Sequence, residues 1–580
     1  MKLSRIFGVL IAGVVLVGLG FLVLYYDLIN YVIPAEDRVE ARFAEPVLAY
    51  FHQHQSAAEN KVQEIRHYAV KWNNLGAWEP SQELEEALAE DGDLLLTVEI
   101  WPGTRKKGAY KATWKAISEG RYDKKIKQLC AAIANRQGLT YLRLNPEMEV
   151  PVELYPWQNQ SPLVYIRGFR HFAGLCKQTA PASKIVWGPA GYPGAMEYWP
   201  GGDFVDVVSL TIRAQSEELT DVYPKDSSVT NIIRRKLHRL RFANKPALIM
   251  VTDKVNKEEY NPEIFKVDVD SIRQYLNAAV HNSASRPGSV TLAADYTAGE
   301  KKEAAKGLML GVYDPELALT DHSAVSVEHI FTDIEEVRSG SFRKIFNEVV
   351  SRKHDVIVTM EPKDTTVAEG GPNVLEKTLR GDYDDVLQEL YATISDAGST
   401  VYLRWAHEME IPITRYQWQS KDPVQYIKAF RYFVDFGAPL ASNIRIVWGP
   451  AGDRGSLEWW PGDEYVDYIS IAIYGLPDKN ITDHRKQESF QQIFQRKFYR
   501  MRFVDKPIFI TEFGVKGPDD YQERWLKGAT KTIKSNPAVV GVCYFNLHDS
   551  PNAWGEIKAP DWSVSEASFN SFAESLVAEE

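Results

Sequence analysis

The sequence predicts an α/β protein built from two tandem (β/α)8 TIM barrels behind an amino-terminal transmembrane helix. Three observations lead to this fold: a long apolar run opens the chain, the chain then repeats itself at a constant spacing, and apolar runs alternate with helical stretches. The 580 residues leave room for two barrels of the usual size of about 250 residues. We therefore expect an anchor in residues 1–34 and barrels in residues 35–303 and 304–580.

The apolar run covers residues 6–26 and is interrupted only by four glycines. It is long enough to cross a hydrocarbon core of about 30 Å, and Lys2 and Arg5 precede it. Because positive residues stay on the cytoplasmic side, we expect a single-pass protein of the cell membrane with both barrels on the periplasmic or extracellular side. A cleaved signal peptide is the alternative, although the apolar part of such a peptide usually has about 7–15 residues.

The remainder of the chain contains an internal repeat. YLRLNPEME at 141–149 matches YLRWAHEME at 402–410, and WPGGDFVD at 199–206 matches WPGDEYVD at 460–467. IVWGPAG occurs at both 185–191 and 446–452, and the spacing between the copies is always 261 residues. An unchanged spacing means that the two copies share element lengths as well as motifs, so we expect two copies of one fold.

Within each copy, strand patterns alternate with helical patterns. In the second copy the strand patterns lie at 307–313, 355–361, 400–406, 444–450, 465–475, 507–513 and 539–545. The helical patterns lie at 342–352, 383–396, 423–436, 490–503 and 521–535. This alternation predicts parallel βαβ units and, at this length, a barrel with its site at the carboxyl ends of the strands. An open doubly wound sheet is the alternative, but no glycine-rich phosphate turn follows a strand.

Two of these strand patterns end in a glutamate. Glu408 follows the strand in YLRWAHEME, which we number as the fourth of the barrel. Glu512 ends the strand in KPIFITEFG, which we number as the seventh. A retaining glycosidase needs one protonated carboxyl group and one carboxylate, about 5–5.5 Å apart, on opposite sides of the bond that it cuts. Glu408 is the candidate proton donor and Glu512 the candidate nucleophile. A single glutamate at a strand end is more often a surface or ion-paired residue, so the pair carries this prediction.

Neighbouring residues add to the candidate site. Arg404 shares a strand face with Glu408, so it can bring positive charge to a barrel interior that also receives Glu512. It can equally serve only to neutralise a buried carboxylate. Tyr474 at the end of the sixth strand and His407 beside Glu408 are candidate polar groups of the site, and packing is the alternative for both.

The second copy resembles glycoside hydrolase family 26 over most of residues 306–575. The resemblance lies in LRWAHEME at 403–410, WPGDEYVDYISIAIYG at 460–475, KPIFITEFG at 506–514, and YFN at 544–546 followed by DW at 561–562. The family is retaining and includes β-mannanases, β-1,3-xylanases and enzymes that cut mixed-linkage β-glucans.

The resemblance implies a role for each matching residue. Glu408 would be the acid/base, Glu512 the nucleophile, His407 a group at the subsite of the attacked sugar, and Tyr474 a hydrogen-bond donor to the nucleophile. The chain departs from the family at Trp405-Ala406, where Pro-Phe is usual, and at Glu410-Ile411, where Asn-Gly is usual. Mannan specificity is therefore left open.

Aromatic side chains make up 12% of the chain, including 15 tryptophans. Their flat faces suit sugar stacking as well as packing. We expect Trp562 and Trp460, one of the pair Trp459-Trp460, to stack on sugar rings, while most tryptophans in a barrel of this size are structural.

The first copy has kept the acid position and lost others. Glu147 stands where the second copy has Glu408, but Asn145-Pro146 replace Ala406-His407 and Arg213 replaces Tyr474. The 261-residue spacing places Val251 at the position of Glu512, and a one-residue bulge would place Asp253 there instead. We therefore interpret the first copy as a degenerate barrel that no longer hydrolyses its ligand.

Composition excludes several classes of function. The net charge is −11 with scattered Lys and Arg, which argues against a nucleic-acid ligand. The three cysteines are odd in number and have no metal-ligand spacing, so neither a disulfide framework nor a zinc site is expected. We expect neither a metal nor a cofactor. The sequence thus predicts a membrane-anchored retaining glycoside hydrolase that cuts a β-linked polysaccharide. A non-catalytic polysaccharide-binding or synthase-associated scaffold, working with polysaccharide synthesis machinery, is the alternative.

Overall fold

The computed structural model of the chain describes thirteen stretches of sequence. They are residues 47–51, 65–73, 75, 78–101, 113–151, 155–213, 229–252, 307–367, 371–412, 415–438, 441–476, 488–551 and 558–578. The chain divides into two compact units, one before about residue 277 and one after it. The predicted anchor at 1–34 and the predicted boundary at 303/304 lie outside the described residues. Within the described residues, no helix is both long enough and apolar enough to cross a membrane.

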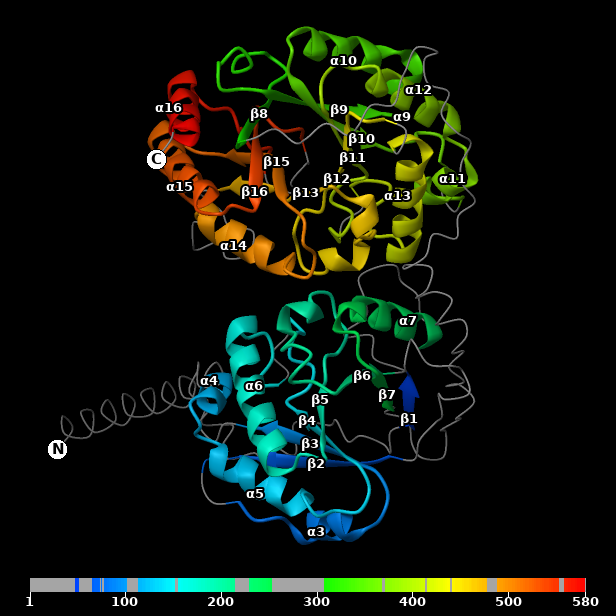
Figure 1. Cartoon of the computed structure of the whole chain (residues 1–580), viewed down its shortest axis with the longest axis vertical. Coiled ribbons are helices and arrows are strands. Elements are labelled where there is room, and N and C mark those ends of the chain that lie inside the picture. The colour runs from blue at the N-terminus through cyan, green and yellow to red at the C-terminus, as the bar shows by residue number, and fades with distance from the viewer. Residues whose placement is uncertain are drawn as a thin grey trace, which may run out of the picture. The chain divides into compact units, whose positions relative to one another are not determined.

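The second unit is an eight-stranded parallel barrel (Figure 1). Its strands are β8 (Met309–Tyr313), β9 (Val327–Asp333), β10 (Asp355–Glu361), β11 (Val401–Trp405), β12 (Ile444–Trp448), β13 (Tyr468–Ile469), β14 (Ile473–Gly475), β15 (Ile508–Val515) and β16 (Val539–Phe545). β8 to β13 pair in parallel in chain order, β15 pairs with β16 and β16 with β8, and β13 and β14 both pair with β15. The short strands β13 and β14 are therefore two pieces of one sixth strand, and the sheet closes on itself.

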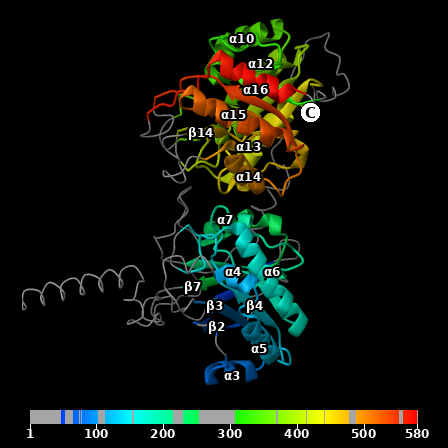
Figure 2. The ribbon, with the colours of Figure 1, turned by 90° about the vertical axis from the view of Figure 1, so that its left-hand side faces the viewer.

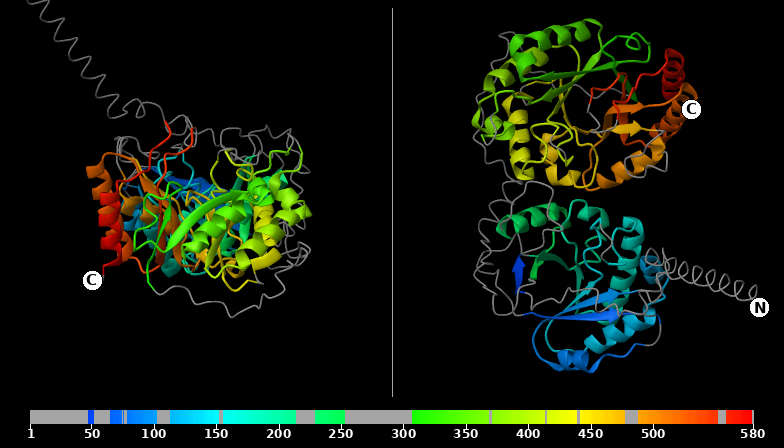
Figure 3. Two further views of the ribbon diagram at one scale, coloured as in Figure 1. Left: turned by 90° about the horizontal axis from the view of Figure 1, so that it is seen from above. Right: turned by 180° about the vertical axis from the view of Figure 1, so that it is seen from behind.

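Helices surround these strands, as the views from the front and from behind both show (Figures 1 and 3). They are α9 (Ile334–Ser339), α10 (Ser341–Ser351), α11 (Val374–Arg380), α12 (Asp384–Ser395), α13 (Pro423–Gly437), α14 (Phe490–Arg500), α15 (Asp519–Lys534) and α16 (Glu566–Val577). The side chains of Asn373, Asp422 and Ser489 accept hydrogen bonds from first-turn amides and so fix the starts of α11, α13 and α14. Figure 2 shows α15 and α16 lying side by side on the outside of the unit.

The barrel interior is packed in layers. Eight buried side chains, one from each strand, form the apolar layer: Met309, Val327, Ile357, Tyr402, Val447, Tyr468, Phe509 and Cys543. A polar layer follows, in which His329 Nε2 and Thr359 Oγ1 lie 2.7 Å apart and the buried Arg404 donates to Thr511 Oγ1. The interior is thus a packed core, and a ligand can reach it only at its ends.

The sequence prediction missed one strand and simplified another. β9 reads VEHIFTD, whose polar Glu328 and His329 hide the strand pattern. Both are buried and partnered, since Arg352 and His354 contact the carboxylate of Glu328. The predicted single strand at 465–475 is interrupted between β13 and β14. Both differences depend on contacts with other strands and helices, which local periodicity does not encode.

The first unit contains a seven-stranded sheet ordered β1-β7-β6-β5-β4-β3-β2. The strands are β1 (Val47–Phe51), β2 (Arg66–Trp72), β3 (Leu94–Ile100), β4 (Thr140–Leu144), β5 (Lys184–Trp187), β6 (Val207–Arg213) and β7 (Ala247–Thr252). The helices are α3 (Gln82–Ala89), α4 (Thr113–Ser118), α5 (Asp123–Ile133), α6 (Pro162–Thr179) and α7 (Val229–Arg239). β2 to β7 are parallel, and β1 pairs antiparallel with β7. The described residues do not close this sheet, so a first (β/α)8 barrel stays a prediction.

The two units nevertheless share their strand positions. β4 coincides with β11 after a shift of 261 residues, and β2 and β3 match β9 and β10 in register after a shift of 262, since Thr97 lies opposite Arg143 as Thr359 lies opposite Arg404. The polar layer also has a counterpart, because His67 Nε2 and Thr97 Oγ1 lie 2.9 Å apart and Arg143 donates to Thr97 and Ser209.

Candidate active site

A strained turn after β11 places Glu408. Ala406 and Glu408 have backbone φ angles of 45° and 53°, in the left-handed region that side chains rarely adopt. The amide of Glu408 donates to Gly449 O at 2.8 Å, and Gln419 Nε2 donates to Glu408 O at 2.9 Å. Trp418 Nε1 donates to His407 O at 2.7 Å. Strain of this kind persists only where the surroundings over-determine it, and it concentrates at functional sites.

Glu512 lies in β15 and receives two donors from other strands. Arg404 of β11 donates to Oε1, and Tyr474 of β14 donates to Oε2 at 3.0 Å. Arg404 and Glu512 are 2% and 6% exposed, so this ion pair is almost free of solvent screening. The donors place a positive charge beside the Glu512 side chain and hold both of its oxygens.

The two glutamates have opposite environments. Burial and, after it, the negative charge of Glu512 raise the pKa of Glu408 to about 8. The carboxyl group of Glu408 is thus held protonated at neutral pH, while that of Glu512 is held by a guanidinium group and a tyrosine hydroxyl. Environments that separate two carboxyl groups in this way identify an acid and a base or nucleophile.

His407 is the middle residue of the turn from Ala406 to Glu408. Its side chain is 2% exposed, and its ring lies 5.1 Å from that of Tyr416. Burial and the nearby positive charge of Arg404 hold the pKa of His407 well below its usual range. His407 is therefore a neutral hydrogen-bonding group at physiological pH.

The part of the chain that carries these residues matches a known protein family. Residues 353–540, which span β10 to α15, match the model of glycosyl hydrolase family 26. The second unit thus contains the stretch that matches this family. We refer to this unit below as the family 26 unit.

Two curated relatives match a similar length of chain. Endoglucanase H of Acetivibrio thermocellus is 32% identical over 160 residues, which are 26% of this chain and 16% of that protein. Beta-1,3-xylanase TXYA of a Vibrio species is 29% identical over 169 residues, which are 28% of this chain and 32% of that protein. The matches therefore span at most about a third of these relatives.

Among solved structures, the catalytic domain of the Bacillus sp. JAMB-750 family 26 endo-beta-1,4-mannanase is similar, with 14% identity and a TM-score of 0.33. That match covers 47% of this chain and 85% of the other.

The two tryptophans predicted to stack on sugar are covered by protein in the family 26 unit. Trp562 is fully buried, packs 4.6 Å from the ring of Tyr474 and donates from Nε1 to Asp549 Oδ2 at 3.2 Å. Trp460 is 6% exposed and meets Trp448 edge to face at 5.1 Å. Burial of this extent favours the packing alternative, in which Trp562 supports the tyrosine that contacts Glu512.

One further carboxylate lies at this end of the barrel and was not among the candidates from sequence. Glu361 ends β10, the strand beside β11, and its Oε1 lies 3.9 Å from His407 Nε2. The signal was available, because DVIVTME ends in a glutamate as the other two strand patterns do. Aromatic residues at neighbouring strand ends complete this region: Tyr313, Phe331 and Phe545.

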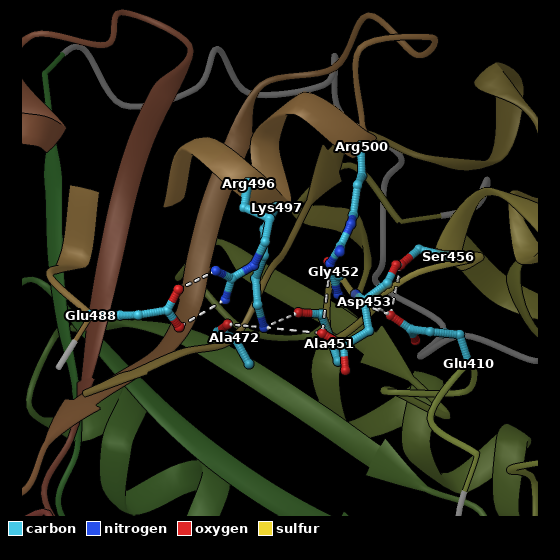
Figure 4. Close-up of polar contacts among 10 residues, drawn as sticks. All are labelled: Glu410, Ala451, Gly452, Asp453, Ser456, Ala472, Glu488, Arg496, Lys497 and Arg500. Atoms are coloured by element: carbon cyan, nitrogen blue, oxygen red, sulfur yellow. Dashed lines mark hydrogen bonds and ion pairs between the residues drawn. The ribbon is translucent and has the colours of Figure 1, made fainter. Parts of the chain in front are cut away.

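Another buried glutamate, Glu410, accepts hydrogen bonds from the loop after β12. Figure 4 shows Glu410 directed at this loop, where Oε1 accepts from Gly452 N at 2.9 Å, Asp453 N at 3.1 Å and Ser456 Oγ at 2.8 Å. On the other side of the loop, Lys497 of α14 donates to Ala451 O and Ala472 O. The departure from the family pattern at Glu410 thus ties the turn that carries Glu408 to the neighbouring loop.

The first unit repeats the turn but lacks counterparts of His407 and Glu512. Asn145 and Glu147 have φ angles of 41° and 61°, and the amide of Glu147 donates to Gly188 O at 2.7 Å. These contacts reproduce those of Ala406 and Glu408. Val251 lies in β7 opposite Ile212 of β6, at the position that Glu512 has in the family 26 unit. Asp253 lies outside the described residues.

No cluster of His, Cys, Asp and Glu in the described part of the chain has the arrangement of a metal site. The expectation that the site needs neither metal nor cofactor stays a prediction.

Proposed function

We propose that the family 26 unit hydrolyses a β-linked polysaccharide with retention of anomeric configuration, by double displacement. The observation that supports this most directly is the pairing of a protonated Glu408 with a Glu512 carboxylate held by Arg404 and Tyr474. Endoglucanase and β-1,3-xylanase relatives support β-glycans as the substrate class.

In the first step, a carboxylate oxygen of Glu512 attacks the anomeric carbon. The glycosidic bond breaks, and Glu408 gives its proton to the leaving oxygen. The product is a glycosyl ester on Glu512. In the second step, the Glu408 carboxylate takes a proton from water, which attacks the anomeric carbon. The ester bond breaks, the sugar leaves with a new hydroxyl group, and both glutamates return to their starting states.

The surrounding residues supply orientation and charge. Arg404 and Tyr474 hold the Glu512 carboxylate in place, which limits the reorganisation that attack requires. The negative charge of Glu512 disappears when the ester forms, so the pKa of Glu408 falls and Glu408 becomes suited to act as a base.

A panel of polysaccharides tests the proposal. The full-length protein should release reducing ends from at least one of β-mannan, mixed-linkage β-glucan, β-1,4-glucan and xylan, and the first product seen by NMR should be the β-anomer. An α-anomer as first product would refute retention. No release from any of the four would favour the alternative of a non-catalytic, synthase-associated scaffold.

The pH dependence follows from the pKa of Glu408. Since this group must be protonated in the first step, kcat/KM should fall about tenfold per pH unit above its pKa of about 8. Below that pH Glu408 is protonated, so kcat/KM should no longer change with pH through this group. A pH series on a soluble substrate measures this, and an alkaline limb below about pH 6 would contradict the assignment.

We propose a non-hydrolytic role for the first unit, which we expect to be a degenerate barrel of the same family. The support is the replacement of the nucleophile by Val251 and of the His407 position by Pro146. Retained aromatic residues such as Trp187 and Trp199 are compatible with sugar binding, but both are buried.

We also propose that the chain is anchored in the cell membrane through residues 1–34, with both units outside the cytoplasm. Lys2 and Arg5 before the apolar run support this orientation. Protease added to spheroplasts should digest both units, and both should sediment with the membrane fraction. Full protection from protease, or recovery of the protein as a soluble periplasmic form, would contradict it.

A further inference from the structure

We propose that Glu361, acting with His407 and Lys363, binds hydroxyl groups of the sugar that occupies the space between Glu408 and Glu512, and that it restricts this subsite to uncharged sugars. This inference rests on the proposed hydrolase function and names a specificity-determining group for it. The group differs from both catalytic glutamates.

The placement of Glu361 is fixed by the barrel. β10 and β11 pair in parallel with Met360 opposite Trp405, so Glu361 leaves its strand at the same end as Glu408. Its side chain is 8% exposed, so it is largely covered by protein. The charges of Arg404 and Glu512 both act on the Glu361 carboxyl group, so it lies in the same electrostatic environment as the nucleophile.

The two oxygens of Glu361 have different partners. Oε2 accepts a hydrogen bond from Lys363 Nζ, while no described residue donates to Oε1. His407 Nε2 lies 3.9 Å from Oε1, which is too far for a direct hydrogen bond. A hydroxyl group between these two atoms could donate to the carboxylate and accept from a ring N–H of the neutral imidazole. A sugar hydroxyl would thereby supply the donor that Oε1 lacks.

Lys363 adds a second contact of the same kind. Its side chain is 45% exposed, and its ammonium group lies 5.7 Å from the ring centre of Tyr416. An ammonium group has three donors and only one is used by Glu361, so it can donate to a neighbouring hydroxyl of the same sugar. Carboxylate, imidazole and ammonium groups together suit two adjacent hydroxyl groups.

The charge balance indicates the class of sugar. Glu361 pairs with Lys363, Glu512 pairs with Arg404, His407 is neutral and Glu408 is protonated. These groups together therefore carry no net charge before the substrate enters. A uronic acid would bring an unpaired carboxylate beside two others, which is costly in a buried site. A neutral hexose or pentose adds no such charge.

The first unit shows the same strand without these partners. Its β3 contains Glu99 in DLLLTVE, which parallels DVIVTME of β10, but Glu99 Oε2 accepts from Trp101 Nε1 at 3.1 Å. Trp101 stands where the family 26 unit has Lys363, and Pro146 stands where it has His407. The arrangement around Glu361 therefore belongs to the unit that has both catalytic glutamates.

Steady-state kinetics of the full-length Glu361→Gln and Lys363→Met variants test the proposal. Glu361→Gln keeps the side-chain volume and should lower kcat/KM on the neutral polysaccharide about 10- to 100-fold, because a hydroxyl loses a charged acceptor. Lys363→Met should cause a smaller loss, since its contact is more exposed. Glu328→Gln is the matched control, because Glu328 is another buried, ion-paired strand carboxylate outside the site, and this variant should retain wild-type kcat/KM.

Monodeoxy aryl glycosides separate a binding role from a structural one. The wild type should reject one particular deoxy sugar strongly, and Glu361→Ala should reject it no more than the parent sugar. Equal discrimination by wild type and variant, or wild-type kcat/KM in Glu361→Gln, would overturn the inference. Faster hydrolysis of a uronate-containing glycan than of its neutral counterpart would overturn the charge argument. These outcomes all require an active wild type, so they are distinct from failure of the hydrolase function itself.

Discussion

Full-length protein with Glu512→Gln should lose polysaccharide hydrolysis by a factor on the order of 10⁴ or more. The amide cannot attack the anomeric carbon, so no glycosyl ester forms and the two-step route has no first step. Reducing-end assays at high enzyme concentration measure this loss. The substitution keeps the side-chain shape and the contacts of Oε1 and Oε2 with Arg404 and Tyr474 as far as an amide allows.

The same variant also tests the division of labour between the units. Because Val251 provides no nucleophile, the first unit should contribute no residual activity. Residual hydrolysis in Glu512→Gln that disappears on adding Glu147→Gln would assign catalysis to the first unit. The exposed Glu523 of α15 offers a control, and Glu523→Gln should behave as wild type.

Glu408→Ala should lower hydrolysis of the polysaccharide about 10²- to 10⁴-fold, the usual contribution of a general acid. The loss should be far smaller in the first step with aryl glycosides whose leaving group needs no proton. Water attack still lacks its base, so the glycosyl ester on Glu512 should accumulate. A rapid burst of nitrophenol followed by slow turnover is the expected signal.

Two further measurements sharpen this prediction. Azide needs no deprotonation, so it should accelerate the slow phase and give a glycosyl azide of retained configuration. The alkaline limb of kcat/KM near pH 8 should vanish in Glu408→Ala, because the group that titrates there is gone. Equal losses on polysaccharide and activated aryl glycoside would assign the acid to another residue.

The positions of the main site residues could be predicted from the sequence alone. Strand patterns ending in Glu408 and Glu512 placed both residues at one edge of a barrel, because parallel strands share a direction. The structure accordingly brings both glutamates into one electrostatic environment. The same reasoning placed Arg404 on the face that meets Glu512, and their side chains are in contact.

Tertiary structure decided what local pattern could not. Arg404 and Glu512 are 108 residues apart, and His329 and Thr511 are 182 residues apart, so closure of the barrel alone brings each pair together. Burial covers Trp562, which was predicted to stack on a sugar ring. Glu361 ends a strand pattern as Glu408 and Glu512 do, but the pairing of β10 with β11 and the 3.9 Å distance to His407 are what place it in the site.

Sequence periodicity thus determined which residues lie at the strand ends, because the direction of each side chain is set locally by the backbone. The protonation of Glu408, the neutral state of His407 and the pairing of Glu361 with Lys363 were decided by the folded structure. These properties depend on desolvation and on charges brought close by other strands, and both exist only after the chain has folded.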